Sequence, residues 1–287
     1  MRPVDASTPG SAHPVLSTGA VGMTIRVLIA VCLLLGANLL VGAATAVLPT
    51  PASEAVAVAL QLTGQVLVCV LVVAAVWLWC RRMERLRLRD VGWSRPVPGR
   101  LLAGTAAGIG LFLAAAGVLA ATGSLTPVDG GPVTEGATPV AVLLVVLGQA
   151  FLLQAIPEEL LFRGWLLTML RDRPVVGLAV STVAFTLIHL FSSGGQTSLL
   201  DHIAYLAIPF GFGLLAGVTV LVTGSIWAAA GVHGGFHLGT TIVLVGWEVT
   251  AHGPLAWTVL GGVYTVAALV LLGTVGRSSV HGSVTSG

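Results

Sequence analysis

Long apolar stretches separated by short polar connections run along almost the whole chain. A helix needs about 20 apolar residues to cross a hydrocarbon core about 30 Å thick. On that rule the sequence predicts eight membrane-spanning helices, at residues 24–48, 55–79, 101–121, 139–170, 175–191, 199–222, 225–246 and 254–275. The sixth is the weakest, because Asp201 and His202 open it and Pro209 interrupts it. The pattern therefore predicts an all-α fold, a polytopic membrane helix bundle.

The composition agrees with this pattern. Of the 287 residues, 56% are hydrophobic and 8% are charged, and the mean hydropathy is +1.00. Such values are not those of a water-soluble domain, so the expected surroundings are a lipid bilayer. A net charge of +2 gives no reason to expect a nucleic-acid partner. All 13 basic residues are Arg, a usage typical of a high-GC bacterial genome, so we expect a multi-pass protein of a bacterial cell membrane.

The arginines indicate the orientation, because cytoplasmic loops are enriched in them. More than half lie in the connection after the second span, residues 81–100, which we interpret as an ordinary cytoplasmic loop. The turn at 171–174 and the tail with Arg277 fall on the same side, so both termini are predicted to be cytoplasmic. The connection 123–138 falls outside and carries Asp129 and Glu135 but no Arg. We expect the first span to remain uncleaved.

Three charged residues interrupt the fourth predicted span. One charge at a bilayer centre costs roughly 2.5–3.5 kcal/mol on insertion scales, so three of them need compensation. Glu159 and Arg163 are four residues apart, which places them on one helix face and favours an ion pair. Glu158 is rotated about 100° away and has no partner on its own helix. Pro157 removes an amide donor and can bend or restart the helix beside it. We therefore expect Glu158 to be the carboxyl that exchanges protons.

Two later spans contribute imidazoles. His189 follows Phe185 by four residues in the fifth span, and His233 and His237 are four apart in the seventh. Two glycines between the latter pair let another helix or an extended substrate approach closely. A single intramembrane His commonly serves packing. Three of them with an unpaired Glu, on three separate spans, indicate a shared polar site.

Together these residues resemble the CPBP family, which groups CAAX prenyl proteases with bacteriocin-processing and immunity proteins. Residues 158–164, EELLFRG, resemble its EExxxR motif, residues 185–189 resemble its FxxxH motif, and residues 225–233 resemble the approach to its third motif. The resemblance implies a catalytic core at 139–246. Around it we expect a disordered cytoplasmic arm at 1–23, three membrane helices with the basic loop at 24–138, and a last helix and tail at 247–287.

The resemblance also implies an intramembrane endopeptidase whose site opens toward the cytoplasmic half. Its site residues would be Glu158, Glu159, Arg163, His189, His233 and His237. Glu158 would activate water, and His189 would hold that water or relay its proton. Glu159 would pair with the arginine and fix the helix. His233 and His237 would stabilise the oxyanion of the tetrahedral intermediate. The expected substrate is a peptide or a membrane protein.

One position departs from the family pattern, because His237 stands where Asn is commonest. An imidazole can still donate a hydrogen bond to an oxyanion. His233 and His237 also have the spacing of a helical zinc pair, and His189 with Glu158 could complete four ligands. A metal-free Glu/His mechanism is also compatible with these residues. The sequence therefore leaves open whether one divalent metal ion, such as zinc, is bound.

Two other classes of protein stay open. A non-catalytic scaffold or immunity protein on the same fold would be compatible with the departure at His237. A proton-coupled transporter would also bury Glu, Arg and His at the midplane, but it favours inverted repeats, and none is apparent. The three cysteines lie in or beside apolar runs without metal-ligand spacing, and we interpret them as small core residues.

Overall fold

A computed structural model describes residues 15–128, 138–192, 194–249 and 254–284, the last of these from 275 onward by backbone alone. Most of the predicted disordered arm, together with Asp129 and Glu135, lies outside the described residues. Eight described helical segments are long and apolar enough to cross a membrane. They are Ala20–Ala46, Glu54–Glu84, Pro98–Ala121, Pro139–Met169, Pro174–Phe191, Leu199–Thr223, Ile226–Gly246 and Pro254–Thr274. The predicted spans are thus confirmed to within a few residues.

The elements follow one another in a simple order. The first half contains α1 (Ala20–Ala46), α2 (Glu54–Trp79), η1 (Cys80–Glu84), η2 (Leu88–Val91), α3 (Pro98–Ala121) and β1 (Leu125–Pro127). The fourth span is α4 (Pro139–Leu147), η3 (Gly148–Ala155), α5 (Ile156–Glu159), η4 (Leu160–Leu166) and α6 (Leu167–Met169). The remainder is α7 (Pro174–Ile188), η5 (His189–Phe191), α8 (Leu199–Tyr205), α9 (Ala207–Thr223), α10 (Ile226–Gly246), β2 (Trp247–Val249) and α11 (Pro254–Val284).

Local sequence explains where several helices begin. Pro98, Pro139 and Pro174 occupy the first turn of α3, α4 and α7. Proline is tolerated there because its missing N–H would have had no partner within the helix. Ser53 and Thr138 accept backbone hydrogen bonds from the first turns of α2 and α4. These caps place the helix starts slightly ahead of the apolar stretches.

The fourth span is continuous but not uniformly α-helical. It changes to a π-helix in η3, returns to α-helix in α5, and changes again in η4. Pro157 lies in the first turn of α5, directly after the first π-helix. The helix therefore continues through Pro157, which lacks the amide N–H that an α-helix would use. π-Helical turns are frequent at functional sites, and here they lie on both sides of Glu158 and Glu159.

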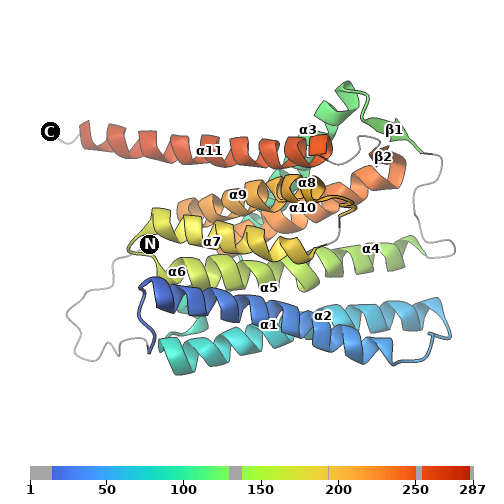
Figure 1. Cartoon of the computed structure of the whole chain (residues 1–287), viewed down its shortest axis with the longest axis horizontal. Coiled ribbons are helices and arrows are strands. Elements are labelled where there is room, and N and C mark those ends of the chain that lie inside the picture. Colours follow the sequence, from blue (N-terminus) through green and yellow to red (C-terminus); the bar gives the residue numbers. More distant parts are fainter. Residues whose placement is uncertain (1–14, 129–137, 193, 250–253, 285–287) are drawn as a thin grey trace.

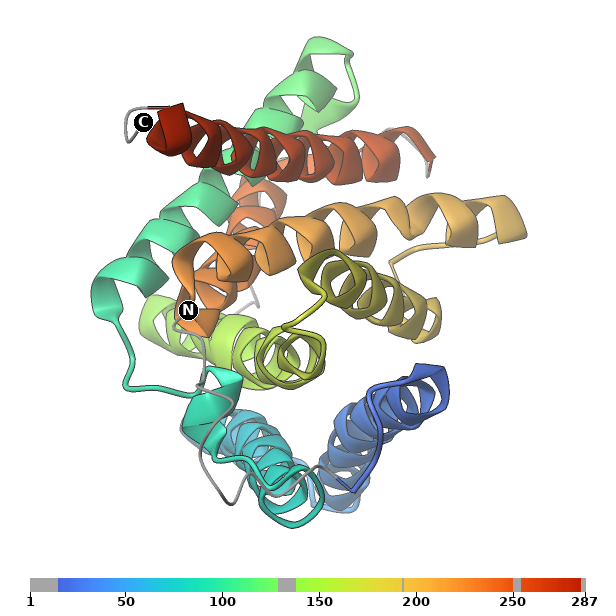
Figure 2. The ribbon, with the colours of Figure 1, turned by 90° about the vertical axis from the view of Figure 1, so that its left-hand side faces the viewer.

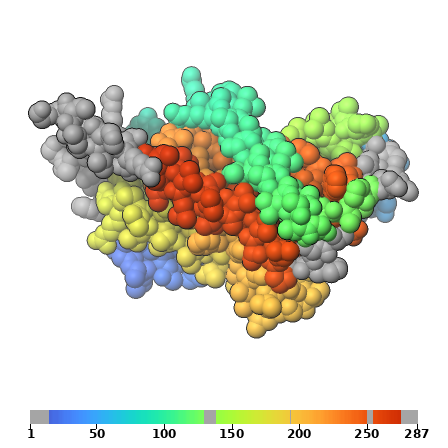
Figure 3. All heavy atoms as spheres, turned by 90° about the horizontal axis from the view of Figure 1, so that it is seen from above, coloured from blue at the N-terminus to red at the C-terminus, as the bar shows by residue number. Residues whose placement is uncertain are grey.

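The helices stack in layers, as Figures 1 and 2 show. α1 and α2 lie beside the fourth span, α7, α9 and α10 form the middle, and α3 and α11 lie on the opposite side. α3 and α11 cover the face seen in Figure 3. α3 approaches α10 through glycines: a methyl group on Gly104 or Gly108 would collide with backbone atoms of α10. Small residues allow such close helix contacts in membranes.

The two ends of the bundle differ in charge. Figure 1 places the start of α1, the basic segment η1–η2, the α6–α7 turn and the end of α11 at one end, which is the basic end predicted to be cytoplasmic. At the other end, β1 and β2 form an antiparallel ribbon in which Leu125 pairs with Val249. This ribbon was not predicted. Strands of three residues are too short to produce a recognisable alternation of polar and apolar positions.

The structure also contains a buried ion pair between α1 and η1 that the sequence did not indicate. Arg26 Nε and Nη2 donate to the two carboxylate oxygens of Glu84 at 2.7 and 2.6 Å, and both side chains are inaccessible to solvent. Trp79 Nε1 donates to the same carboxylate at 3.0 Å. The guanidinium also donates to the backbone oxygens of Leu16 and Ser17. This cluster ties the start of α1 to the basic loop, 58 residues further along the chain.

Candidate active site

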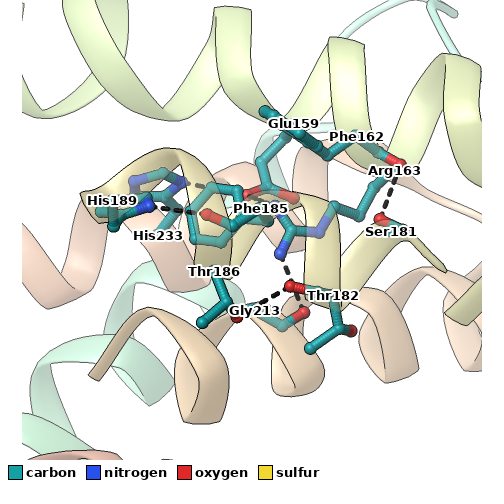
Figure 4. A network of polar contacts seen from close by, with 10 residues as sticks. All are labelled: Glu159, Phe162, Arg163, Ser181, Thr182, Phe185, Thr186, His189, Gly213 and His233. Atoms are coloured by element: carbon teal, nitrogen blue, oxygen red, sulfur yellow. Dashed lines mark hydrogen bonds and ion pairs between the residues drawn. The ribbon is translucent and has the colours of Figure 1, made fainter. Parts of the chain in front are cut away.

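A buried polar cluster joins the fourth span to α9 and α10 (Figure 4). Glu159 Oε1 accepts hydrogen bonds from Arg163 Nη1 at 3.0 Å and from His233 Nδ1 at 2.9 Å. Arg163 Nη2 donates to the backbone oxygen of Gly213 at 2.9 Å. None of these three residues, Glu159, Arg163 and His233, is more than 1% exposed. The ion pair expected from the spacing of four residues is present, and His233 is an additional partner that the sequence did not indicate.

The packing around Arg163 explains its fixed position. Its guanidinium carbon lies 4.1 Å from the centre of the Phe185 ring, within cation–π distance. A side chain on Gly213 would press on the guanidinium nitrogen and on that ring. The backbone of α9 can therefore approach Arg163 because residue 213 is glycine. The position of the cluster thus depends on three residues from three different helices: Arg163, Phe185 and Gly213.

Glu158 points away from this cluster toward a cavity. Its Oε2 atom is buried and makes no hydrogen bond within the described part of the chain. The cavity has a volume of about 830 Å³, and its lining includes Glu158, His189, His233 and His237. Four of the six predicted site residues therefore surround one space. Glu159 and Arg163 are not in the lining, but Glu159 is joined to it by the hydrogen bond from His233.

The hydrogen bonds of two imidazoles define their tautomers. His189 Nδ1 lies 2.7 Å from the backbone oxygen of Phe185, which can only accept, so Nδ1 carries the proton. His233 Nδ1 likewise donates to Glu159, because the carboxylate is paired with arginine. In their neutral forms, both rings leave an Nε2 lone pair as an acceptor. The ring nitrogens of His237 make no hydrogen bond to other described residues, so this imidazole is free to offer an N–H.

Gln154 is a member of the lining that the motif analysis missed. Its side-chain oxygen is buried and has no partner among the described residues. It precedes Glu158 by four residues, a spacing that places two side chains on one face of a helix. That spacing was the available signal. Its carboxamide adds one N–H₂ donor group to the lining that also contains Glu158.

The walls of the cavity are mainly apolar and aromatic. Phe112 of α3, Phe212 of α9, Phe236 of α10 and Trp257 of α11 all line it. The lining continues to Leu125 and Val249 of the ribbon and to the exposed glycines 194 and 195. These parts lie at the end of the bundle away from the basic loop. The resemblance instead implied a site that opens toward the cytoplasmic half.

The side chains do not form a metal centre as they stand. Within the described ranges, no three His, Cys, Asp or Glu side chains come close enough together to hold a metal ion. The hydrogen bonds at Nδ1 leave Nε2 of His189 and His233 available, as in metal-binding histidines, but the described donors do not converge on one point. The donor set therefore does not fit a preformed zinc site, and the mechanism below uses no metal.

These features define a polytopic membrane protein with a carboxyl and three imidazoles around an intramembrane cavity. Residues 139–239 of the chain match the family described as Type II CAAX prenyl endopeptidase Rce1-like. The match confirms the CPBP resemblance over a segment that contains all six predicted site residues, and it supports an intramembrane endopeptidase of the CAAX type. No curated protein matches the chain.

Proposed function

We propose that the chain hydrolyses a peptide bond inside the membrane with a water molecule activated by Glu158. The observation that carries this proposal is the buried carboxylate oxygen of Glu158, which has no hydrogen-bond partner among the described residues and lines a cavity shared with three imidazoles. A structural carboxylate at this depth would be expected to have a counter-charge, as Glu159 does. Glu158 is instead available to a molecule in the cavity.

The proposed steps follow from the available donors and acceptors. Glu158 takes a proton from water while the water oxygen attacks the peptide carbonyl carbon. The Nε2 acceptors of His189 and His233 orient that water. His237, with the carboxamide of Gln154, donates hydrogen bonds to the oxyanion. When the C–N bond breaks, Glu158 returns the proton to the amine product, so the carboxylate is regenerated.

The Glu159–Arg163 pair has a positioning role in this scheme. It keeps Nδ1 of His233 protonated, so that His233 offers a lone pair rather than an N–H to the cavity. The pair also joins the fourth span to α9 through Gly213. Positioning of this kind supports catalysis without contact to the substrate.

The test compares the natural protein with Glu158→Gln in detergent, using a library of internally quenched peptides. General acid–base groups commonly contribute about 10²–10⁴ in rate, and a water-activating base can contribute all measurable turnover. We expect Glu158→Gln to lose cleavage while its unfolding temperature stays unchanged. Glu248→Gln, which alters an exposed carboxyl on β2 outside the lining, is the matched control and should cleave normally.

Metal content and the effect of a chelator are measured on the same samples. We expect cleavage to survive chelation, because the described donors do not gather around one point. Loss of activity on chelation, with recovery on adding zinc, would contradict the metal-free scheme. Equal cleavage by Glu158→Gln would contradict the assignment of the base. Absence of cleavage by the natural protein would favour a non-catalytic scaffold or immunity protein.

A further inference from the structure

Most helices that reach the cavity contribute residues from the ribbon end of the bundle, while Glu158 and His233 lie near the middle of their helices. α3 runs away from the basic loop, and its contribution, Phe112 to Leu119, comes from its later half. α9 runs toward the basic end, and it contributes its earlier half, from Ile208 to Phe212. α11 contributes only its first turns. The ribbon residues Leu125 and Val249 complete this end.

The other side of the site is filled by side chains and close backbone contacts. Phe162 and Trp165 are inaccessible to solvent and lie in the fourth span between Glu158 and the basic end. Gly231 of α10 leaves no room for a methyl group against the backbone of α3. At the start of α10, Trp227 Nε1 donates to the backbone oxygen of Ser94 in the basic loop at 3.1 Å. These residues pack between the site and the basic end, and none of them lines the cavity.

The distribution of charge indicates which compartment the cavity faces. The basic end carries the arginines of residues 81–100 and of the α6–α7 turn, and the positive-inside rule places such an end in the cytoplasm. Among the residues whose side chains are described, the ribbon end carries no arginine. The cavity therefore faces the opposite compartment, although Glu158 itself lies nearer the basic end of its span.

We propose that the cavity admits its substrate from the extracytoplasmic face, as an extended peptide segment with uncharged, mainly apolar residues around the scissile bond. This inference rests on the proposed function and deepens it. Apart from Glu158 and the histidines, the described lining contains no ionisable group other than Tyr205. A charged peptide side chain would find no counter-ion on these aromatic walls and would be disfavoured there.

Cysteine labelling tests the side of entry without requiring activity. Cys32, Cys69 and Cys80 are replaced by Ala, and a single cysteine is then placed at Thr126 on β1, Thr240 in the cavity lining, or Arg89 in the basic loop. The variants react with a membrane-impermeant maleimide in right-side-out and in inside-out vesicles. Thermal unfolding of the cysteine-free protein confirms that the background is folded.

We expect Thr126→Cys and Thr240→Cys to react in right-side-out vesicles and to lose labelling in inside-out vesicles. Arg89→Cys should show the reverse. Labelling of Thr240→Cys together with Arg89→Cys in inside-out vesicles would overturn the proposal, because the cavity would then face the cytoplasm. A Thr240→Cys variant that reacts from neither face would overturn it as well.

Cleavage in the same vesicles connects the side of entry with activity. Two membrane-impermeant, internally quenched peptides are used: one has apolar residues around the scissile bond, and the other has Asp and Lys there. Each is added to right-side-out and to inside-out vesicles, and vesicles with Glu158→Gln serve as the negative control. We expect cleavage of the apolar peptide in right-side-out vesicles, and in inside-out vesicles only after detergent. Cleavage of the charged peptide at an equal rate would overturn the substrate class. No cleavage in detergent would refute the proposed function, whereas the labelling would still decide the side of entry.

Discussion

At the scale of single residues, the proposed mechanism assigns the oxyanion's hydrogen bond to His237. His189 and His233 are fixed as acceptors by their hydrogen bonds at Nδ1, so His237 is the ring that can donate. We predict that His237→Asn, which keeps an N–H donor, retains substantial cleavage. His237→Leu should lose about 10²–10³ in kcat, the usual cost of removing one oxyanion donor. The measurement is the rate of peptide cleavage at saturating substrate.

The unfolding temperatures of both variants separate catalysis from folding. His237 contacts the rings of His233 and Phe236, and Leu preserves an apolar surface there. Equal rates for His237→Leu and the natural protein would remove His237 from the mechanism. A fall in rate that follows a matching fall in unfolding temperature would assign it to packing instead.

Residue-scale chemistry was only partly predictable from the sequence. The Glu159–Arg163 pair followed from a spacing of four residues on one helix. The hydrogen bond from His233 to Glu159 joins positions 74 residues apart, and no local pattern specifies such a pair. Gln154 had a usable signal in its distance of four from Glu158. The tautomers of His189 and His233 required coordinates, because they depend on which acceptor faces each ring.

At the scale of elements, the contact between α3 and α10 depends on glycine. A methyl group at Gly108 would collide with the backbone oxygen of Val232, whereas nothing lies within 4 Å of one at Gly110 on the same helix. We predict that Gly108→Ala lowers the free energy of unfolding by about 1–3 kcal/mol, the usual cost of overpacking. It should also reduce cleavage, since α10 carries His233 and His237.

Gly110→Ala is the matched control for this prediction. It adds the same methyl group two positions away, and alanine favours the helix by roughly 1 kcal/mol over glycine. Its stability should be unchanged or slightly higher, as measured by chemical unfolding in detergent micelles. Equal destabilisation by the two substitutions would show that helix packing at Gly108 is not the cause.

At the scale of the whole molecule, Arg26 and Glu84 join the first helix to the basic loop. Removing one partner of a buried ion pair commonly costs about 3–5 kcal/mol, because the other charge is left uncompensated. We predict a loss of that size for Glu84→Ala. Arg89→Ala removes one partner of an exposed pair, at 3.7 Å from Asp90, and should change stability by less than about 1 kcal/mol. Thermal unfolding in one detergent gives both values.

A double variant, Arg26→Leu with Glu84→Leu, provides the second control. It removes both charges together, and buried ion pairs replaced by apolar residues are often nearly neutral in stability. We expect it to recover much of the stability that Glu84→Ala loses. If Glu84→Ala and Arg89→Ala shift the unfolding temperature equally, the buried pair contributes no more to stability than the exposed pair does.

The whole bundle was the most predictable level. Membrane spans are local runs of apolar residues, so eight of them could be counted directly from the sequence. The side on which the cavity lies could not, because it depends on which halves of α3, α9, α10 and α11 surround Glu158. The ribbon and the Arg26–Glu84 pair were missed for the same reason, since each joins segments far apart in the chain.

The π-helical turns of the fourth span have a consequence for how this protein can vary. Each such turn accommodates a residue that an α-helix would not need, so losing one residue from 148–155 can be absorbed by reversion to α-helix. The outer part of the span would then keep its rotation and depth, whereas the same loss from a regular α-helix would turn it by about 100° and shift it by about 1.5 Å. Glu158, Glu159 and Arg163 would also keep their places, so the half of the span that carries the proposed site would tolerate the loss of one residue upstream.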